Sequence, residues 1–133
     1  MAESGGFVGV YFMPYLNPTG HARAEDVVAH LEHAVMVCGE DHVGIGADGS
    51  VTGIDDLAAY RAHLAAEIAD RAAKGVGATG ERADTYPFVV DLRGAEQFHT
   101  LERLLRGKGW RQRRIEKVLG RNFAAYARAV WGG

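Results

Sequence analysis

The chain has 133 residues, of which 47% are hydrophobic and 24% are charged, and its formal net charge is −2. This length suits one domain with its own core, and the composition excludes a disordered, collagen-like or coiled-coil chain. The single cysteine, Cys38, excludes an internal disulfide framework and a four-cysteine zinc site. We expect it to be a small buried hydrophobe in a helix. No apolar run reaches the roughly 18 residues that a membrane span needs.

Charge is divided unevenly along the chain. Residues 1–90 carry 5 basic and 13 acidic side chains, and residues 91–133 carry 10 basic and 4 acidic ones, which gives formal charges of −8 and +6. A basic tail can bind nucleic acid, but it more often forms a solvated face or complements an acidic part of the same fold. We therefore expect no nucleic-acid partner.

The first third of the chain predicts a βαβ unit. Residues 7–13 are almost uniformly apolar, which is typical of a parallel strand buried on both faces. Residues 24–38 place apolar side chains at a helical period, with acidic residues in the first turn and Gly39 at the expected C-cap. A second apolar run, 42–47, follows directly, so the crossover makes the two strands parallel. The apolar positions of the helix are Val27, Val28, Leu31, Ala34, Val35 and Cys38.

The rest of the chain predicts helices joined by loops. A helix at about 57–74 follows Asp55 and Asp56 as candidate caps, and residues 75–86 form a loop. Residues 87–90 suggest a short extended piece. Further helices are expected at about 95–106, 111–119 and 121–131.

The beginning of the chain is unusual for an α/β domain. Residues 1–4 followed by two glycines are typical of a last helical turn and its glycine cap. Two good strands cannot form an α/β sheet covered on both faces. We therefore expect residues 1–133 to be a single partial domain, a piece of something larger.

The carboxyl ends of the strands are the expected place for a functional site. The first strand runs into Met13, Pro14 and Tyr15, and the second ends at Asp48 beside Gly49. A carboxylate at that position can act in catalysis or hold a ligand. The alternative is a loop aspartate that caps its own turn.

His30 and His33 have a helical spacing that can bind zinc, but both lie away from the apolar face, and no third ligand is near them. We expect a surface pair and no metal site. The sequence also lacks a phosphate-binding loop, a dinucleotide-binding glycine motif and a serine nucleophile elbow.

Several motifs closely resemble the C-terminal third of membrane (renal-type) dipeptidases. They are GGFVGVYFMP at 5–14, EDVVAHLEH at 25–33, DHVGIGAD at 41–48, LLRGKGW at 104–110 and IEKVLGRN at 115–122. The order and spacing of these motifs make the resemblance specific. It covers nearly the whole chain and is weakest at 49–87.

The resemblance implies a (β/α)8 TIM-type barrel that hydrolyses dipeptides with a pair of zinc ions at its carboxyl face. Residues 7–13 would be the seventh barrel strand and 43–47 the eighth, while the metal ligands would come from earlier strands, upstream of this chain. Asp48 alone matches a functional position, which handles a proton or binds the substrate amine. Ala47-Asp48-Gly49-Ser50 replaces the family's Ser-Asp-Phe-Asp-Gly, so its second aspartate is absent.

Two hypotheses follow. The first is a C-terminal fragment of a zinc dipeptidase, inactive by itself, whose substrate in the full enzyme is a dipeptide. The second is a non-catalytic interaction or dimerising module, with an exposed apolar edge as its binding surface and a homodimer as its product. Cytoplasmic localisation is a default, since a signal peptide would be lost from a truncated chain.

Overall fold

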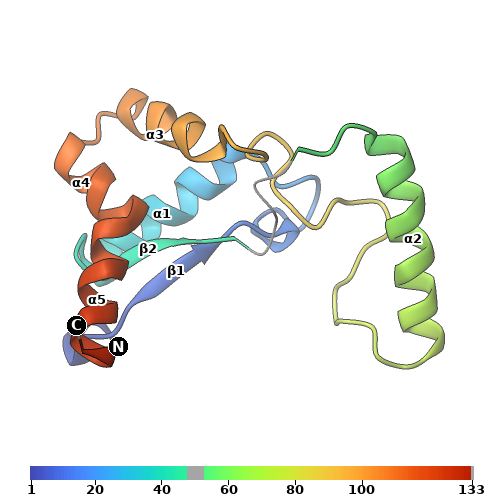
Figure 1. Cartoon of the computed structure of the whole chain (residues 1–133), viewed down its shortest axis with the longest axis horizontal. Coiled ribbons are helices and arrows are strands. Elements are labelled where there is room, and N and C mark those ends of the chain that lie inside the picture. Colours follow the sequence, from blue (N-terminus) through green and yellow to red (C-terminus); the bar gives the residue numbers. More distant parts are fainter. Residues whose placement is uncertain (48–52, 133) are drawn as a thin grey trace.

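A computed structural model describes residues 1–47 and 53–132, and its N-terminal part is the predicted βαβ unit. Strand β1 (Val8–Tyr11) and strand β2 (Val43–Gly46) pair in parallel, with Val8 opposite Val43 and Tyr11 opposite Gly46. Helix α1 (Ala24–Cys38) connects them and lies alongside the sheet (Figure 1). The mixed α/β class and the parallel pairing are confirmed, although both strands are shorter than predicted.

Local hydrogen bonds explain where α1 begins and ends. Asp26 Oδ2 accepts from the Arg23 backbone N–H at 2.8 Å, and Asp91 Oδ1 accepts from the Ala24 N–H at 2.7 Å. These carboxylates pair N–H groups that a helix start leaves without partners. At the other end Gly39 has a φ of 82°, which glycine adopts without strain. The predicted apolar face is confirmed: Val27, Val28 and Leu31 are buried, and Ala34, Val35 and Cys38 pack partly buried against the core.

The prediction that the first strand is buried on both faces is wrong. Only Val10 of β1 is buried, and Gly9 and Tyr11 are exposed. The side chains of the two strands in fact alternate between the two faces of the sheet. Valine and isoleucine lie on the core side, and the glycines of both strands lie on the opposite face. That opposite face carries Gly9, Tyr11, Gly44 and Gly46.

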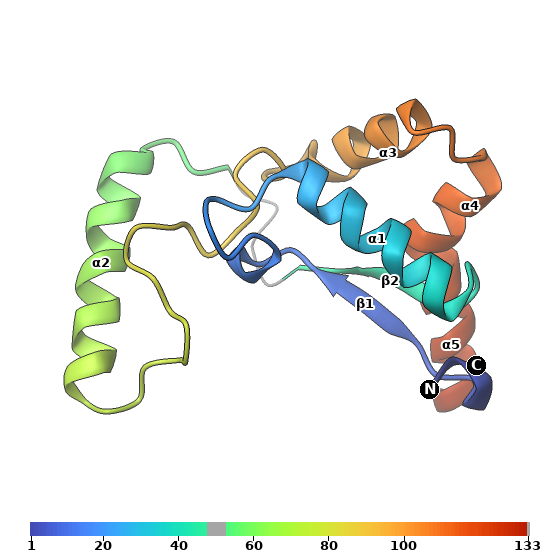
Figure 2. The same ribbon diagram turned by 180° about the vertical axis from the view of Figure 1, so that it is seen from behind.

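Helix α2 (Leu57–Ala73) stands apart from the sheet, as both views show (Figures 1 and 2). Asp56 caps it as predicted, because its Oδ1 accepts from the backbone N–H groups of Ala58 and Ala59, both at 2.9 Å. The chain then returns to the sheet through the predicted loop.

The extended piece expected at 87–90 is not a strand. The segment is bent, and the Val90 N–H donates to the Ala22 carbonyl at 3.0 Å instead of joining the sheet. Val89 and Leu92 are buried in the core around this turn. The segment thus contributes Val89 and Leu92 to the core from a turn and not from a strand.

The C-terminal part is helical, as predicted. It consists of α3 (Gln97–Gly107), α4 (Gln112–Glu116), a π-helical turn (Lys117–Arg121) and α5 (Asn122–Trp131). The two helices predicted at 111–119 and 121–131 form one bent run, with Gly120 at a non-helical dihedral. A glycine at a π-turn is a known cause of such a kink.

The acidic and basic parts of the chain meet where this run packs on β2. Lys117 Nζ lies 2.8 Å from Glu40 Oε1 and 2.6 Å from Asp41 Oδ1, and Arg114 Nε lies 2.7 Å from Glu40 Oε2. At this contact the basic tail thus complements the acidic part of the same fold, which is one of the alternatives the sequence left open.

The described residues also form two 3-10 turns. The first (Ala2–Ser4) ends at Gly5, whose φ is 75°, in agreement with the predicted helical turn and glycine cap. The second (Pro14–Leu16) follows β1 after Phe12 and Met13. Among the described residues, no helix is both long enough and apolar enough to cross a membrane.

Candidate functional site

The carboxyl ends of β1 and β2 lie at the same edge of the sheet, because the strands are parallel. Met13, Pro14 and Tyr15 follow β1 at this edge, and Ala47 follows β2. The predicted site residue Asp48 lies outside the described residues. The structure therefore describes the strand ends that form this edge, up to Ala47. The role of Asp48 stays a prediction.

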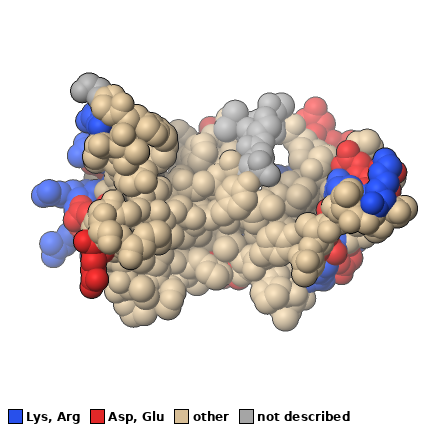
Figure 3. Space-filling model, turned by 90° about the horizontal axis from the view of Figure 1, so that it is seen from below, with Lys and Arg blue, Asp and Glu red and all other residues tan. Residues whose placement is uncertain are grey.

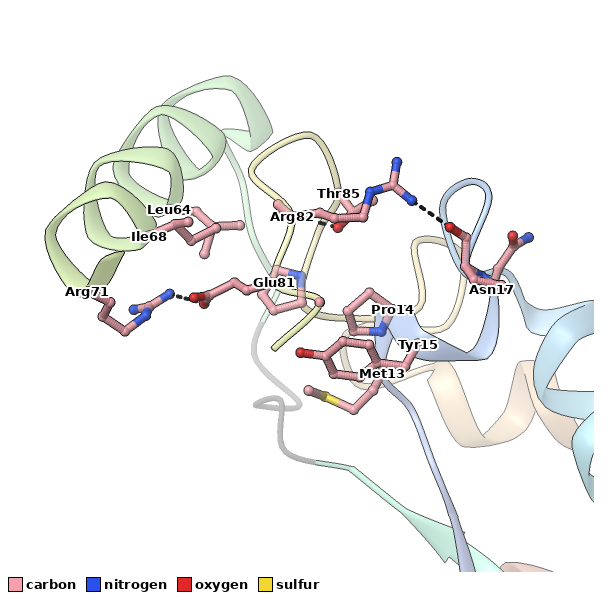
Figure 4. A pocket seen from close by; sticks show the side chains of 13 residues that line it. Met13, Pro14, Tyr15, Asn17, Leu64, Ile68, Arg71, Glu81, Arg82 and Thr85 are labelled. Atoms are coloured by element: carbon pink, nitrogen blue, oxygen red, sulfur yellow. Dashed lines mark hydrogen bonds and ion pairs between the residues drawn. The ribbon is translucent and has the colours of Figure 1, made fainter. Parts of the chain in front are cut away.

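A cavity of about 410 Å³ opens beside the segment that follows β1 (Figure 4). One wall is Met13, Pro14 and Tyr15, and the opposite wall is formed by Leu64 and Ile68 of α2. The return loop contributes the remaining side. Volumes of about 300–1,000 Å³ with mostly apolar walls are typical of small-molecule sites.

Ion pairs line the polar side of this cavity. Arg71 Nη2 lies 2.5 Å from Glu81 Oε1, and this contact lowers the pKa of Glu81 and raises that of Arg71. Arg82 donates from Nε and Nη2 to the two carboxylate oxygens of Asp84 at 2.9 and 2.7 Å. Its Nη1 also donates to the Pro18 carbonyl at 3.0 Å. Each charged side chain of the described lining therefore has an opposite charge beside it.

A row of rings connects α2 to the rest of the molecule. The ring centroids of Tyr60 and Phe88 are 5.7 Å apart, those of Phe88 and Tyr86 are 5.1 Å apart, and those of Tyr86 and His21 are 5.5 Å apart. Desolvation of the Tyr60 phenol raises its pKa. The sequence predicts only a loop at 75–86 and assigns no role to His21. The signal that this prediction passed over was the aromatic and charged content of 81–88.

The histidines of α1 lie where the sequence predicted. His30 and His33 are both exposed, and His30 Nε2 lies 3.2 Å from the Leu16 carbonyl oxygen. Within residues 1–47 and 53–132, no three His, Cys, Asp or Glu side chains come together as a metal site. The described residues therefore do not fit the zinc pair that the resemblance implies.

A family model described as "Membrane dipeptidase (Peptidase family M19)" matches residues 1–79. This chain belongs to that family. The resemblance carried by the sequence motifs is thereby confirmed, over the βαβ unit and α2. No curated protein matches the chain.

Solved structures extend the likeness to almost the whole fold. An amidohydrolase from Pseudomonas aeruginosa is 26% identical with a TM-score of 0.72, over 99% of this chain and 38% of that one. A dipeptidase described as a metallopeptidase of family M19 is 21% identical with a TM-score of 0.65, over 99% of this chain and 30% of that one. At this lower identity the likeness concerns the fold alone. The chain thus spans about a third of the length of these two structures.

Proposed function

We propose that this chain is the C-terminal part of a dipeptide-hydrolysing enzyme of the membrane dipeptidase family. The observation that carries the proposal is the family match over residues 1–79. The parallel β1–α1–β2 unit supports it, because such a unit supplies two neighbouring strands of a (β/α)8 barrel. We assign β1 and β2 to the last two strands of that barrel.

The exposure of β1 and of the segment after it supports a partial barrel. Figure 3 shows the side on which β1 lies in Figure 1, and the Lys, Arg, Asp and Glu side chains of the described residues gather mainly at its two ends. Tyr11 and Tyr15 are 42% and 53% exposed although they lie in and just after β1. A parallel sheet is normally buried on both faces. Further strands of a barrel would bury these side chains.

Zinc belongs to the proposal only for the whole enzyme. Since the described residues hold no group of three potential ligands, we assign the zinc ligands to other parts of the enzyme and none to α1 or the sheet. The chain by itself is then expected to be inactive.

We assign Asp48 the role of a catalytic and substrate-binding carboxylate. The assignment is supported by the family motif and by the position two residues after Gly46, where β2 ends. At the carboxyl edge of a barrel strand, a carboxylate can accept a proton or pair with the ammonium group of a dipeptide. Of the two aspartates in the family's motif, this chain has only the first, Asp48.

A second candidate function is a non-catalytic homodimerising module. The observation that favours it is the exposure of large apolar side chains on α5, since Phe123, Val130 and Trp131 are 50%, 55% and 71% exposed. Isolated exposed apolar residues are ordinary, but a contiguous group marks interfaces. A second copy packed against α5 would bury these three side chains.

A dipeptide hydrolysis assay and the molecular mass in solution distinguish the enzyme from the dimerising module. The 133-residue chain and a polypeptide extended upstream by in-frame codons are each incubated with a dipeptide and Zn²⁺, and their masses are measured by light scattering. We expect hydrolysis by the extended polypeptide only. Failure of the extended polypeptide to hydrolyse any dipeptide would contradict the proposal. A stable dimer of the short chain would then support the dimerising module.

A further inference from the structure

We infer that the cavity between Pro14 and α2 binds an uncharged, apolar side chain of a peptide ligand. That the ligand is a peptide rests on the proposed function. The preference for an apolar group rests on the cavity itself. No residue of this cavity belongs to the motif that contains Asp48.

The first argument is the chemistry of the facing walls. Met13 and Pro14 come from the segment after β1, and Leu64 and Ile68 project from α2 toward the cavity (Figure 4). Leu64 is only 8% exposed, so its side chain is already held in a dry environment. An apolar group bound between these walls would be removed from contact with water on both of its sides. This transfer is favourable in proportion to the apolar area that is buried.

The second argument is the absence of a spare charge in the described lining. Arg71 is paired with Glu81, and Arg82 is paired with Asp84 and with the Pro18 carbonyl. The Thr85 hydroxyl donates to the Arg82 carbonyl at 3.3 Å. A charged ligand side chain would lose its hydration without gaining an unpaired counter-charge, which is costly. An uncharged side chain avoids this cost.

The third argument is the position of the cavity. It opens at the carboxyl end of β1, the edge at which barrel enzymes bind their substrates. A dipeptide bound at this edge could place one side chain between η2 (Pro14–Leu16) and α2 while its peptide bond stays over the sheet. The cavity would then determine specificity and would not perform the chemical step.

Methyl NMR of the 133-residue chain tests the inference without any turnover. The probes are Leu-Leu, Gly-Gly and Glu-Glu dipeptides, and the observed signals are the methyl groups of Met13, Leu64 and Ile68. The buried Leu101 and Ile115 serve as distant reference methyls. We expect Leu-Leu to shift the three cavity signals and to bind at least about 10-fold more tightly than Gly-Gly or Glu-Glu. Equal affinity for the three dipeptides, or shifts confined to the reference methyls, would overturn the inference.

Two matched variants of α2 separate filling of the cavity from a general effect on the helix. Ile68→Trp adds a ring inside the cavity, whereas Ala62→Trp adds the same ring on an exposed position of the same helix. We expect Ile68→Trp to weaken Leu-Leu binding at least about 10-fold and Ala62→Trp to change it by less than about twofold. Equal effects of the two variants would overturn the inference.

Failure of this inference is distinguishable from failure of the proposed function. If the cavity signals respond to Leu-Leu but the upstream-extended polypeptide hydrolyses no dipeptide, the cavity stands and the enzyme assignment fails. If the extended polypeptide hydrolyses Leu-Leu and Gly-Gly with equal kcat/KM, and Ile68→Trp leaves both values unchanged, the enzyme assignment stands and the cavity inference fails.

Discussion

The side-chain amide of Asn122 donates a hydrogen bond to the Val43 carbonyl oxygen over 2.8 Å. The same Nδ2 atom lies 2.7 Å from the Glu40 carbonyl oxygen, so one amide serves both sides of the turn that leads into β2. Asn122 is 7% exposed and Val43 is fully buried. The first residue of α5 thereby anchors the start of the second strand.

We predict that Asn122→Ala destabilises the fold by about 1–3 kcal/mol, because it leaves buried carbonyl oxygens without a donor. Asn122→Asp should cost more at neutral pH, since its carboxylate oxygens would face those carbonyls. Urea unfolding of each variant measures the change in free energy. The control is Gln112→Ala, which removes an exposed side chain and should cost less than about 0.5 kcal/mol. An Asn122→Ala variant as stable as this control would contradict the prediction.

The contact between Glu40 and the basic tail should make stability depend on acid pH. Hydrogen bonds from Lys117 and Arg114 lower the pKa of Glu40 from 4.5 to about 2. Because the folded-state pKa is the lower one, the stabilisation is complete above the unfolded value and is lost as pH falls from about 4.5 toward 2. Glu40→Gln should therefore lower Tm at pH 7, and the difference from the parent chain should shrink toward pH 2.

Thermal melts of Glu40→Gln at several pH values between 7 and 2 check this prediction. The control is Glu32→Gln, because Glu32 is exposed on α1 and makes no ion pair with the described residues. Its Tm difference should be small and independent of pH. A Glu40→Gln difference that stays constant down to pH 2 would show that the carboxylate charge is not the cause.

The paired glycines of the sheet should differ in their tolerance of a methyl group. Gly9 and Gly44 are partners in register, but an added Cβ at Gly44 would overlap with Phe7 Cζ. The Phe7 ring cannot move freely, because its centroid lies 5.8 Å from that of Phe123 and 5.7 Å from that of Tyr126. At Gly9 the nearest atoms are 3.7 Å or more from the added Cβ.

We therefore predict that Gly44→Ala destabilises the chain by about 1–3 kcal/mol, as overpacking does, and that Gly9→Ala has a smaller effect. Urea unfolding of the two variants gives the comparison. Near-ultraviolet circular dichroism reports whether the aromatic cluster has moved in Gly44→Ala only. If both variants lose the same stability, the position of Phe7 over Gly44 has no energetic importance.

The proposed role of Asp48 predicts a loss of rate without a loss of fold. In the upstream-extended polypeptide, Asp48→Asn should lower kcat by about 10²–10⁴ while Tm stays nearly constant, as removal of a general acid or base does. A capping role alone would instead cost about 1 kcal/mol of stability and leave kcat intact. Asp55→Asn, a substitution of a neighbouring loop aspartate, is the matched control. A stable and fully active Asp48→Asn variant would remove the assigned role.

Local patterns were enough to predict the βαβ unit. Helix α1 has the bounds expected from its 3.6-residue period and from Gly39, and Asp56 begins α2 because its side chain caps the neighbouring backbone. Both signals act within a few residues of the chain, so they are readable without the fold. The family motifs likewise pointed to the correct family.

Contacts between distant segments could not be predicted in this way. The face of β1 that stays exposed, the turn at 87–90 and the cavity beside α2 all depend on which segments meet in space. The cavity joins residues 13–18 to 64–71 and 80–87, and the pairing of Glu40 with Lys117 spans 77 residues. No periodicity or spacing in the sequence indicates these contacts, because burial and ion pairing depend on which segments pack together. The sequence by itself therefore determined the elements and the family, whereas only the tertiary structure decided which side chains form the candidate site.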